Sequence, residues 1–342
     1  MVEAIYVLFI LVMLSIFLPD RAKNSKIIYI TFFLFFFLIA GFRPIGSDRD
    51  YFNYYNYWYY GGGNMEFSFK LIVRLLKDIL KLPVQYLFVV FAFFSILLKF
   101  VAIPKLTQLK YLTLLLYLSH YFILNDFTQI RAAVASGFFL LAMKPLYDRN
   151  FKFFFIIISL AVVFHYSAIV LYFMWFLKND NKKSLWLYFI VPLGYLFSLF
   201  DFNIAVINIP LDYINQKIAI YNELSKSGDT ETVNLFNAAY LLRILVYYTI
   251  LLNKQRIGKN NKYTFLLLKI YALSLFALPA LSSLSAVAFR IHELLGIIEI
   301  ILFPFLIFLF KKGERALSYV FLIGMCVIFL FLNIYYNKLI LE

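Results

Sequence analysis

The 342-residue sequence is poor in the residues on which several protein classes depend. Cys326 is its only cysteine, so neither a disulfide within the chain nor a cysteine metal cluster is available. Its three histidines show no metal-binding spacing, so we expect no metal and no cofactor. Charged residues are 15%, against about 25% in soluble domains. Hydrophobic residues reach 64%, more than a soluble domain of this length could bury.

The apolar residues are gathered into runs that are separated by short polar loops. The runs are 2–18, 27–42, 84–103, 111–125, 131–146, 153–164, 168–177, 184–200, 237–253, 264–281, 291–310 and 316–336. A crossing takes about 20 residues. We therefore predict an all-α polytopic membrane protein with about twelve transmembrane helices, built as a single transmembrane domain over 1–342. The first run lacks a basic leader and a small-residue cleavage site, so we expect it to be a retained helix.

The net charge of +14 is mainly an orientation signal. Short loops after alternate runs hold 18 of the 32 lysines and arginines, namely 19–26, 104–110, 144–152, 178–183, 254–262 and 311–315. Basic loops stay in the cytoplasm, so we place these six inside and expect no nucleic-acid partner.

One segment, 153–177, tests this topology because basic loops flank it on both sides. A single tilted crossing would put the later basic loops outside. A hairpin at His165 keeps every basic loop inside, although each arm is then too short to cross. We favour the hairpin, whose tip must be buried in protein or line a wet cavity.

Two larger loops, about 43–83 and 201–236, then face outward. Within the first, Lys70, Arg74, Lys77 and Lys81 share one face of a predicted amphipathic helix over 67–82. Such a helix lies in the membrane interface. It either anchors on anionic headgroups or guides an anionic lipid substrate.

Polar residues at the outer helix ends are the candidates for chemistry. The planar guanidinium of arginine matches the geometry of phosphate oxygens. A charged side chain at membrane depth is costly and usually serves a function. A single arginine can instead extend its side chain to the lipid headgroups. The candidate pyrophosphate ligands are Arg131, Arg290, Arg43 and Arg243. His165 is the first candidate for a general base and Asp48 the second. The aromatic and amide run 51–60 offers Tyr51, Tyr54, Tyr55 and Trp58 for stacking on sugars, or else forms an interfacial belt.

At these residues the chain resembles the EpsG-like branch of the bacterial Wzy-type O-antigen and exopolysaccharide polymerases. The matching features are Gly41-Phe42-Arg43 with Gly46-x-Asp48, Gln129-Ile130-Arg131-Ala132-Ala133, Phe164-His165-Tyr166-Ser167-Ala168 and Phe289-Arg290, in that order. They are accompanied by a Tyr-rich outer segment, and the helix pattern covers nearly the whole length.

The resemblance implies a metal-independent, inverting glycosyltransferase with a GT-C-like bundle in the bacterial inner membrane. Donor and acceptor would be undecaprenyl-pyrophosphate-linked oligosaccharides at the periplasmic face, among membrane lipids and with a chain-length regulator protein as a partner. From the chemistry of the residues, we expect His165, Asp48 and Arg131 to be the catalytic residues of this reaction. A lipid-linked oligosaccharide flippase, an O-antigen ligase and a sugar O-acetyltransferase remain as alternatives.

Overall fold

The computed structural model describes residues 1–342 except 20–21, 23–24, 64, 181–183, 201–232 and 342. Helices dominate this part of the chain, and all twelve predicted apolar runs fall on helical segments. Four segments among the described residues are long and apolar enough to cross a membrane, namely Gln85–Leu106, Ile130–Tyr147, Ser282–Leu309 and Ala316–Tyr336. The described residues are therefore helical, as predicted, and include candidate membrane spans, whereas the count of twelve crossings stays a prediction. Most of the second predicted outer loop lies outside the described residues.

The chain divides into two compact units, residues 1–175 with 303–342, and residues 176–302. The first contains α1 (Val2–Ser15), α3 (Lys26–Gly41), α4 (Tyr51–Tyr60), α5 (Phe67–Val73), α6 (Gln85–Leu106), α7 (Lys110–Leu116), α8 (Ile130–Tyr147), α9 (Phe151–Phe164) and α17 (Ala316–Phe331). The second contains α10 (Trp186–Leu199), α12 (Ala238–Leu252), α13 (Lys254–Gly258), α14 (Thr264–Ala280), α15 (Ser285–Gly296) and α16 (Glu299–Leu302), with α14 packed against α10, α12 and α15.

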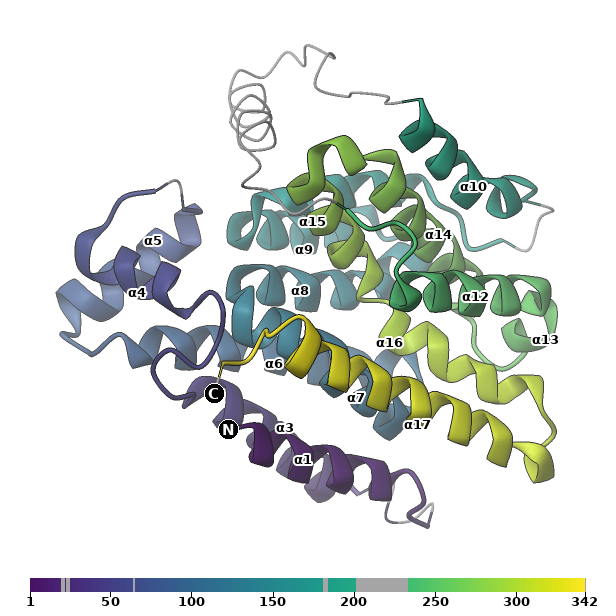
Figure 1. Ribbon diagram of the computed structural model, residues 1–342, viewed down its shortest axis with the longest axis horizontal. Helices are drawn as coiled ribbons and strands as arrows, with labels where there is room; N and C mark the ends of the chain where they lie inside the picture. Colours follow the sequence, from purple (N-terminus) through teal and green to yellow (C-terminus); the bar gives the residue numbers. More distant parts are fainter. Residues whose placement is uncertain (20–21, 23–24, 64, 181–183, 201–232, 342) are drawn as a thin grey trace. The chain divides into compact units, whose positions relative to one another are not determined.

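In the first unit, α8 lies between α6 and α9 (Figure 1). The contact with α6 is close because Gly137 on α8 has no side chain. A Cβ atom there would stand 2.7 Å from Cβ of Leu98 and 3.3 Å from the carbonyl oxygen of Ser95. Glycine thus lets the backbones of these two apolar helices approach, as small residues do at helix interfaces in membranes.

The hairpin predicted at His165 is present in the structure. Asn150 caps α9 by accepting a hydrogen bond from the backbone N–H of Phe153. The helix ends at Phe164, and the backbone of His165 after it is extended. The following turns, Tyr166–Phe176, run back along α9. The rings of Phe155 and Tyr172 lie 4.6 Å apart. Which side of the membrane the flanking basic loops face remains a prediction.

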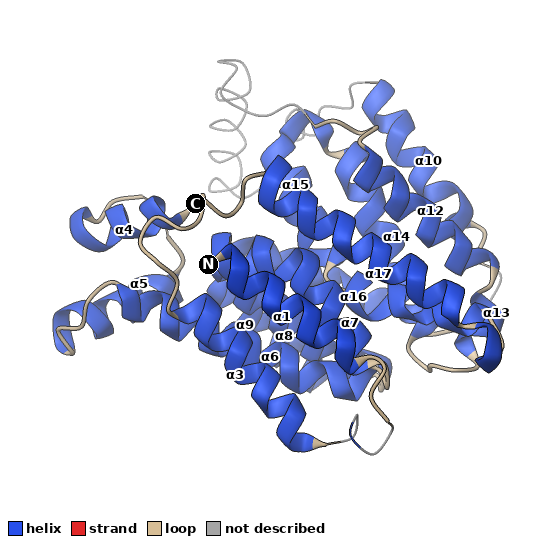
Figure 2. Ribbon diagram, turned by 60° about the horizontal axis from the view of Figure 1, so that its bottom comes forward, coloured by secondary structure: helices blue, strands red, loops and turns tan. Residues whose placement is uncertain are grey.

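The first outer loop forms two short helices that lie beside each other (Figures 1 and 2) and pack against α6, α8 and α9 of the first unit. α4 covers the aromatic and amide run, and α5 continues into the π-helical stretch Arg74–Ile79. The predicted amphipathic helix is thus present over 67–79. On the side of this helix that faces the protein, Phe69 and Leu76 pack with aromatic residues of α4 and α6.

Candidate functional site

Glu66, His165 and Arg131 meet in the first unit, although each comes from a different element. Glu66 precedes α5, His165 is the hairpin tip, and Arg131 is the second residue of α8. Nδ1 of His165 lies 3.3 Å from Oε1 of Glu66, and Nη1 of Arg131 forms an ion pair with Oε2 of the same carboxylate. The side chain of Glu66 is 6% exposed, His165 12% and Arg131 23%. The carboxylate is thus enclosed while its two partners keep access to solvent.

The surroundings of Glu66 hold it as a carboxylate. Burial alone raises its pKa, but the contact with His165 and the charge of Arg131 outweigh that effect and lower the pKa to about 2. Glu66 therefore stays ionised at neutral pH. An ionised carboxylate beside Nδ1 favours the proton on that nitrogen, which leaves Nε2 of His165 as the acceptor.

Contacts around the cluster fix the relative positions of the three residues. The hydroxyl of Ser68, in the first turn of α5, donates to the carbonyl oxygen of Val163 at 2.7 Å and so joins the start of α5 to the end of α9. The guanidinium of Arg131 lies over the ring of Phe69 at 5.7 Å and over that of Tyr54 at 5.9 Å.

Residues 126–129 are the last turn of the π-helical stretch Tyr117–Thr128 and the residue after it, and they lead directly into α8 and Arg131. This turn is held by buried charges. The carboxylate of Asp126 contacts the ammonium of Lys99 at 3.0 Å and accepts a hydrogen bond from the Tyr117 hydroxyl at 2.6 Å. Lys99 also donates to the carbonyl oxygen of Ala133, within the first turns of α8, at 3.1 Å. Lys99 therefore ties this turn to the helix that carries Arg131.

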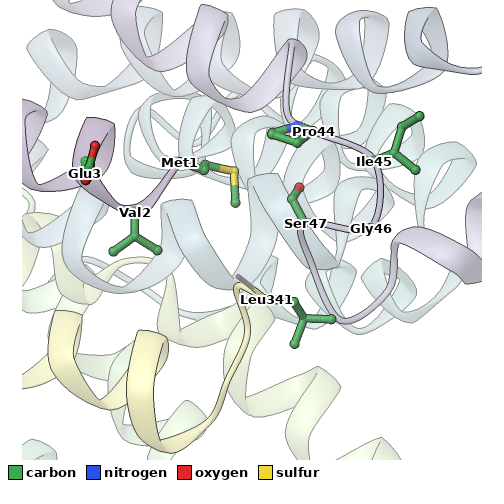
Figure 3. Close-up of a pocket in the computed structure, with 8 residues that line it drawn as sticks. All are labelled: Met1, Val2, Glu3, Pro44, Ile45, Gly46, Ser47 and Leu341. Carbon is green, nitrogen blue, oxygen red and sulfur yellow. The ribbon is translucent and has the colours of Figure 1, made fainter.

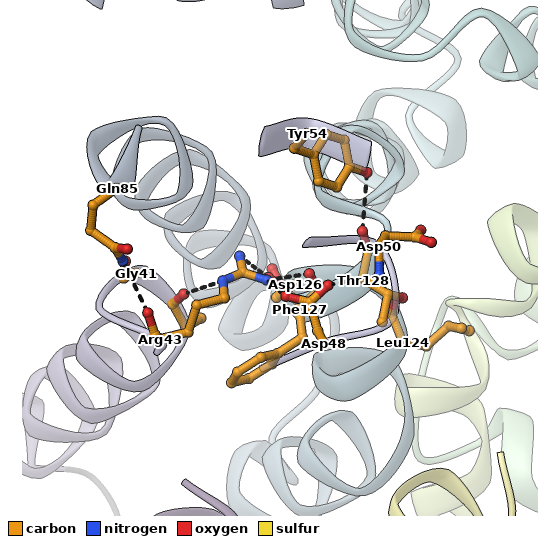
Figure 4. Close-up of polar contacts among 11 residues, drawn as sticks. Gly41, Arg43, Asp48, Asp50, Tyr54, Gln85, Leu124, Asp126, Phe127 and Thr128 are labelled. Atoms are coloured by element: carbon orange, nitrogen blue, oxygen red, sulfur yellow. Dashed lines mark hydrogen bonds and ion pairs between the residues drawn. The ribbon is translucent and has the colours of Figure 1, made fainter. Parts of the chain in front are cut away.

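Arg43 also holds this turn (Figure 4). Its guanidinium donates to the carbonyl oxygens of Asp126, at 3.0 Å, and of Phe127, and it pairs with Asp48 at 3.1 Å. Nε of Arg43 donates to the carbonyl oxygen of Ala40. The side chains of Arg43 and Asp48 are fully buried. Both predicted site residues are thus enclosed and engaged with the protein, and their parts in catalysis and in pyrophosphate binding stay predictions.

Three of the four predicted sugar-binding residues face the core. Tyr51, Tyr54 and Trp58 are buried, and only Tyr55 is partly exposed. The Tyr51 ring stacks on Phe88 of α6 at 4.7 Å, and the Tyr54 hydroxyl donates to the carbonyl oxygen of Thr128 at 3.0 Å. The inner face of α4 therefore supports the turn before Arg131, and sugar contact by these four residues stays a prediction.

Arg243 and Arg290, the other predicted arginines, lie in the second unit. Nε of Arg243, on α12, contacts the buried carboxylate of Glu299 at 3.0 Å. The hydroxyl of Tyr271 donates to that carboxylate at 2.9 Å. Arg290 lies on α15, two residues before the buried His292. Arg243 is therefore paired within its own unit.

A cavity of about 450 Å³ lies beside the loop that carries Asp48 (Figure 3). Its walls include Glu3, Ser47 and Leu341, but none of Glu66, His165 and Arg131. Across the described ranges, no group of three or more histidine, cysteine and acidic residues could hold a metal.

Glu66 is the site residue that the sequence did not reveal. It is a single carboxylate between a glycine run and the amphipathic helix, and no periodicity or motif marks it. The backbone of α5 places it, since the Glu66 carbonyl oxygen accepts from the Lys70 N–H in the first helical turn. Only the folded hairpin shows that this carboxylate meets His165.

Comparison with known proteins gives one informative result. No curated protein and no solved structure matches the chain. A family model, that of the EpsG family, matches residues 26–341. This match includes Glu66, Arg131 and His165 and spans nearly all of the sequence, and the chain therefore belongs to the EpsG family.

Proposed function

We propose that this protein is a membrane polysaccharide polymerase that joins lipid-linked oligosaccharide repeat units. Membership of the EpsG family supports a general polymerase role. The observation that carries the proposal is the cluster in which one enclosed carboxylate, Glu66, contacts both His165 and Arg131. The cluster combines the imidazole of His165, which can accept a proton, with the guanidinium of Arg131, which can bind a phosphate.

His165 is the general base of the proposed reaction. Its Nε2 takes the proton of an acceptor sugar hydroxyl as the oxygen attacks the anomeric carbon of the donor. The new C–O bond forms while the bond from that carbon to the pyrophosphate oxygen breaks, and the pyrophosphate leaves with the electron pair. A single displacement of this kind inverts the anomeric centre. Glu66 is a positioning residue that orients the imidazole and stabilises its protonated form.

Arg131 is the proposed partner of the leaving pyrophosphate. Its side chain is partly exposed, whereas that of Arg43 is fully buried, so Arg131 keeps donors within reach of a substrate. It is also the second residue of α8, where the helix dipole adds partial positive charge. Fixed cations of this kind stabilise charge that develops on the leaving group. Undecaprenyl pyrophosphate as the carrier, the periplasmic face and a GT-C-type bundle belong to the same proposal.

Surface polysaccharide in a deletion strain tests this function. Complementation with the wild-type chain should restore long glycans, whereas His165→Ala should leave single repeat units on the surface lipid. Absence of all surface glycan in the deletion strain would instead indicate a flippase. Long glycans without the protein would contradict any role in polymerisation.

A further inference from the structure

The outward side of α5 and its π-helical extension carries two parallel rows of side chains. The first row is apolar and has a spacing of four: Phe67, Leu71, Leu75 and Ile79 are 65%, 54%, 45% and 66% exposed. The second row is basic: Lys70 and Arg74 lie on the helix, and Lys81 follows shortly after its end at Ile79, all three with exposed side chains. We call these the apolar row and the basic row.

The apolar row is not part of the protein core. The inner face of the same helix, with Phe69, Val73 and Leu76, is buried in an aromatic cluster. Lys77 is engaged inward, because its ammonium donates to the carbonyl oxygen of Trp58 at 2.5 Å. The helix is therefore fixed to the protein along one side and presents the two rows on the other.

We infer that the two rows dock α5 onto the anionic headgroups of the bilayer surface. A single phosphate group would need cations that converge on one point. Lys70 instead lies on α5 and Lys81 follows the π-helical stretch that ends at Ile79, so the cations are spread along the segment. A row of cations beside a row of apolar side chains matches a plane where headgroups meet acyl chains. Asp78 is the only acidic residue in 67–82, so the charge of the helix suits an anionic surface.

This docking fixes the depth of the site. Glu66 immediately precedes α5, and Ser68 joins that helix to the hairpin tip beside His165. A helix held at the headgroup level therefore places Glu66, His165 and Arg131 at that level. Resting on the proposed function, this is the depth at which the pyrophosphate of a lipid-linked substrate lies.

Spin labels on the full-length protein test the docking. Labels are placed at Leu71 and Leu75 in a Cys326→Ala background, with Asn53 and Asn56 on the exposed face of α4 as matched controls. In phosphatidylglycerol nanodiscs, labels on the apolar row should be more accessible to oxygen and less accessible to a water-soluble nickel complex than the controls. Lys70→Gln with Arg74→Gln and Lys81→Gln should abolish this difference, as should phosphatidylcholine alone. If labels on the apolar row are as accessible to nickel as the controls in phosphatidylglycerol nanodiscs, the inference is overturned.

Turnover in the same nanodiscs separates this inference from the proposed function. Each basic residue near an anionic surface contributes about fivefold to its attraction, so the triple variant should lose at least several-fold in turnover in phosphatidylglycerol. If the apolar-row labels are as accessible to nickel as the controls while His165→Ala abolishes turnover, the docking is wrong and the function stands. If the labels lie in lipid while His165→Ala retains turnover, the docking stands and the function is wrong.

Discussion

The ammonium nitrogen of Lys99 lies 3.0 Å from both carboxylate oxygens of Asp126, and neither side chain is exposed. Two charges at this depth are tolerated because they satisfy each other and because Tyr117 donates to the same carboxylate. The pair ties α6 to the turn before Arg131, so the position of the proposed leaving-group cation depends on it.

Breaking this pair from one side should destabilise the fold. Lys99→Met leaves the carboxylate of Asp126 buried without its counter-charge, which costs about 3–5 kcal/mol. The thermal melting point of the purified protein should fall clearly. Lys99→Met combined with Asp126→Asn removes both charges and should recover part of the loss. A single variant that melts like wild type, or a double variant no better than the single one, would argue against a structural ion pair.

The acid stability of the protein should report the low pKa of Glu66. Its folded pKa, about 2, is below its ordinary value of 4.5, so the native state favours the carboxylate. The resulting stabilisation is about 3 kcal/mol, fully present above pH 4.5 and lost as the pH falls towards 2. Melting points of wild type and Glu66→Gln should therefore differ most near neutral pH and converge in acid. A constant difference at every pH would show that Glu66 does not titrate with this depressed pKa.

Lysine substitutions at Arg131 and Arg43 should have different consequences. Arg131→Lys should keep the melting point but lose about tenfold to a hundredfold in turnover, because a point charge lacks the bidentate fork and one charge-assisted hydrogen bond is worth about 1.5–3 kcal/mol. Arg43→Lys should lower the melting point, since lysine cannot reach Ala40, Asp48, Asp126 and Phe127 together. Melting curves and turnover of both variants check this. If the two variants lose melting temperature and turnover alike, Arg131 and Arg43 do not have these different roles.

The hairpin predicts that both of its flanking loops face the cytoplasm. Single cysteines at Lys152 and Lys178, in a Cys326→Ala background, should both react with an impermeant maleimide only from the cytoplasmic side. Labelling of the two positions from opposite sides would mean that the segment crosses the membrane once.

The helical runs and the hairpin could be predicted from the sequence because apolar periodicity and loop charge act over short stretches. Arg131 and His165 could be singled out because a charged or polar side chain beside an apolar run is costly to bury and therefore usually has a function. Glu66 could not, since its role depends on a contact between residues about one hundred positions apart along the chain, and nothing local marks such a pair.

The contacts of Arg43 could not be predicted from the sequence either. In the sequence, an arginine at a helix end has the same pattern whether its guanidinium binds a substrate phosphate or donates to four acceptors of its own chain. Only the fold shows that the turn at 126–129 reaches it. The aromatic run was ambiguous for a similar reason, because stacking on a sugar and stacking on Phe88 use the same ring face.

The most direct measurement of the central claim is chain elongation by purified protein in nanodiscs that contain a lipid-linked repeat unit. Wild type should build long glycans and release the lipid pyrophosphate. His165→Ala should be slower by about a hundredfold or more, the usual contribution of a general base. His120→Ala is the matched control, because its imidazole lies 3.0 Å from Asn333 and outside the cluster, and it should retain activity. A fully folded His165→Ala protein that elongates chains at the wild-type rate would contradict the account.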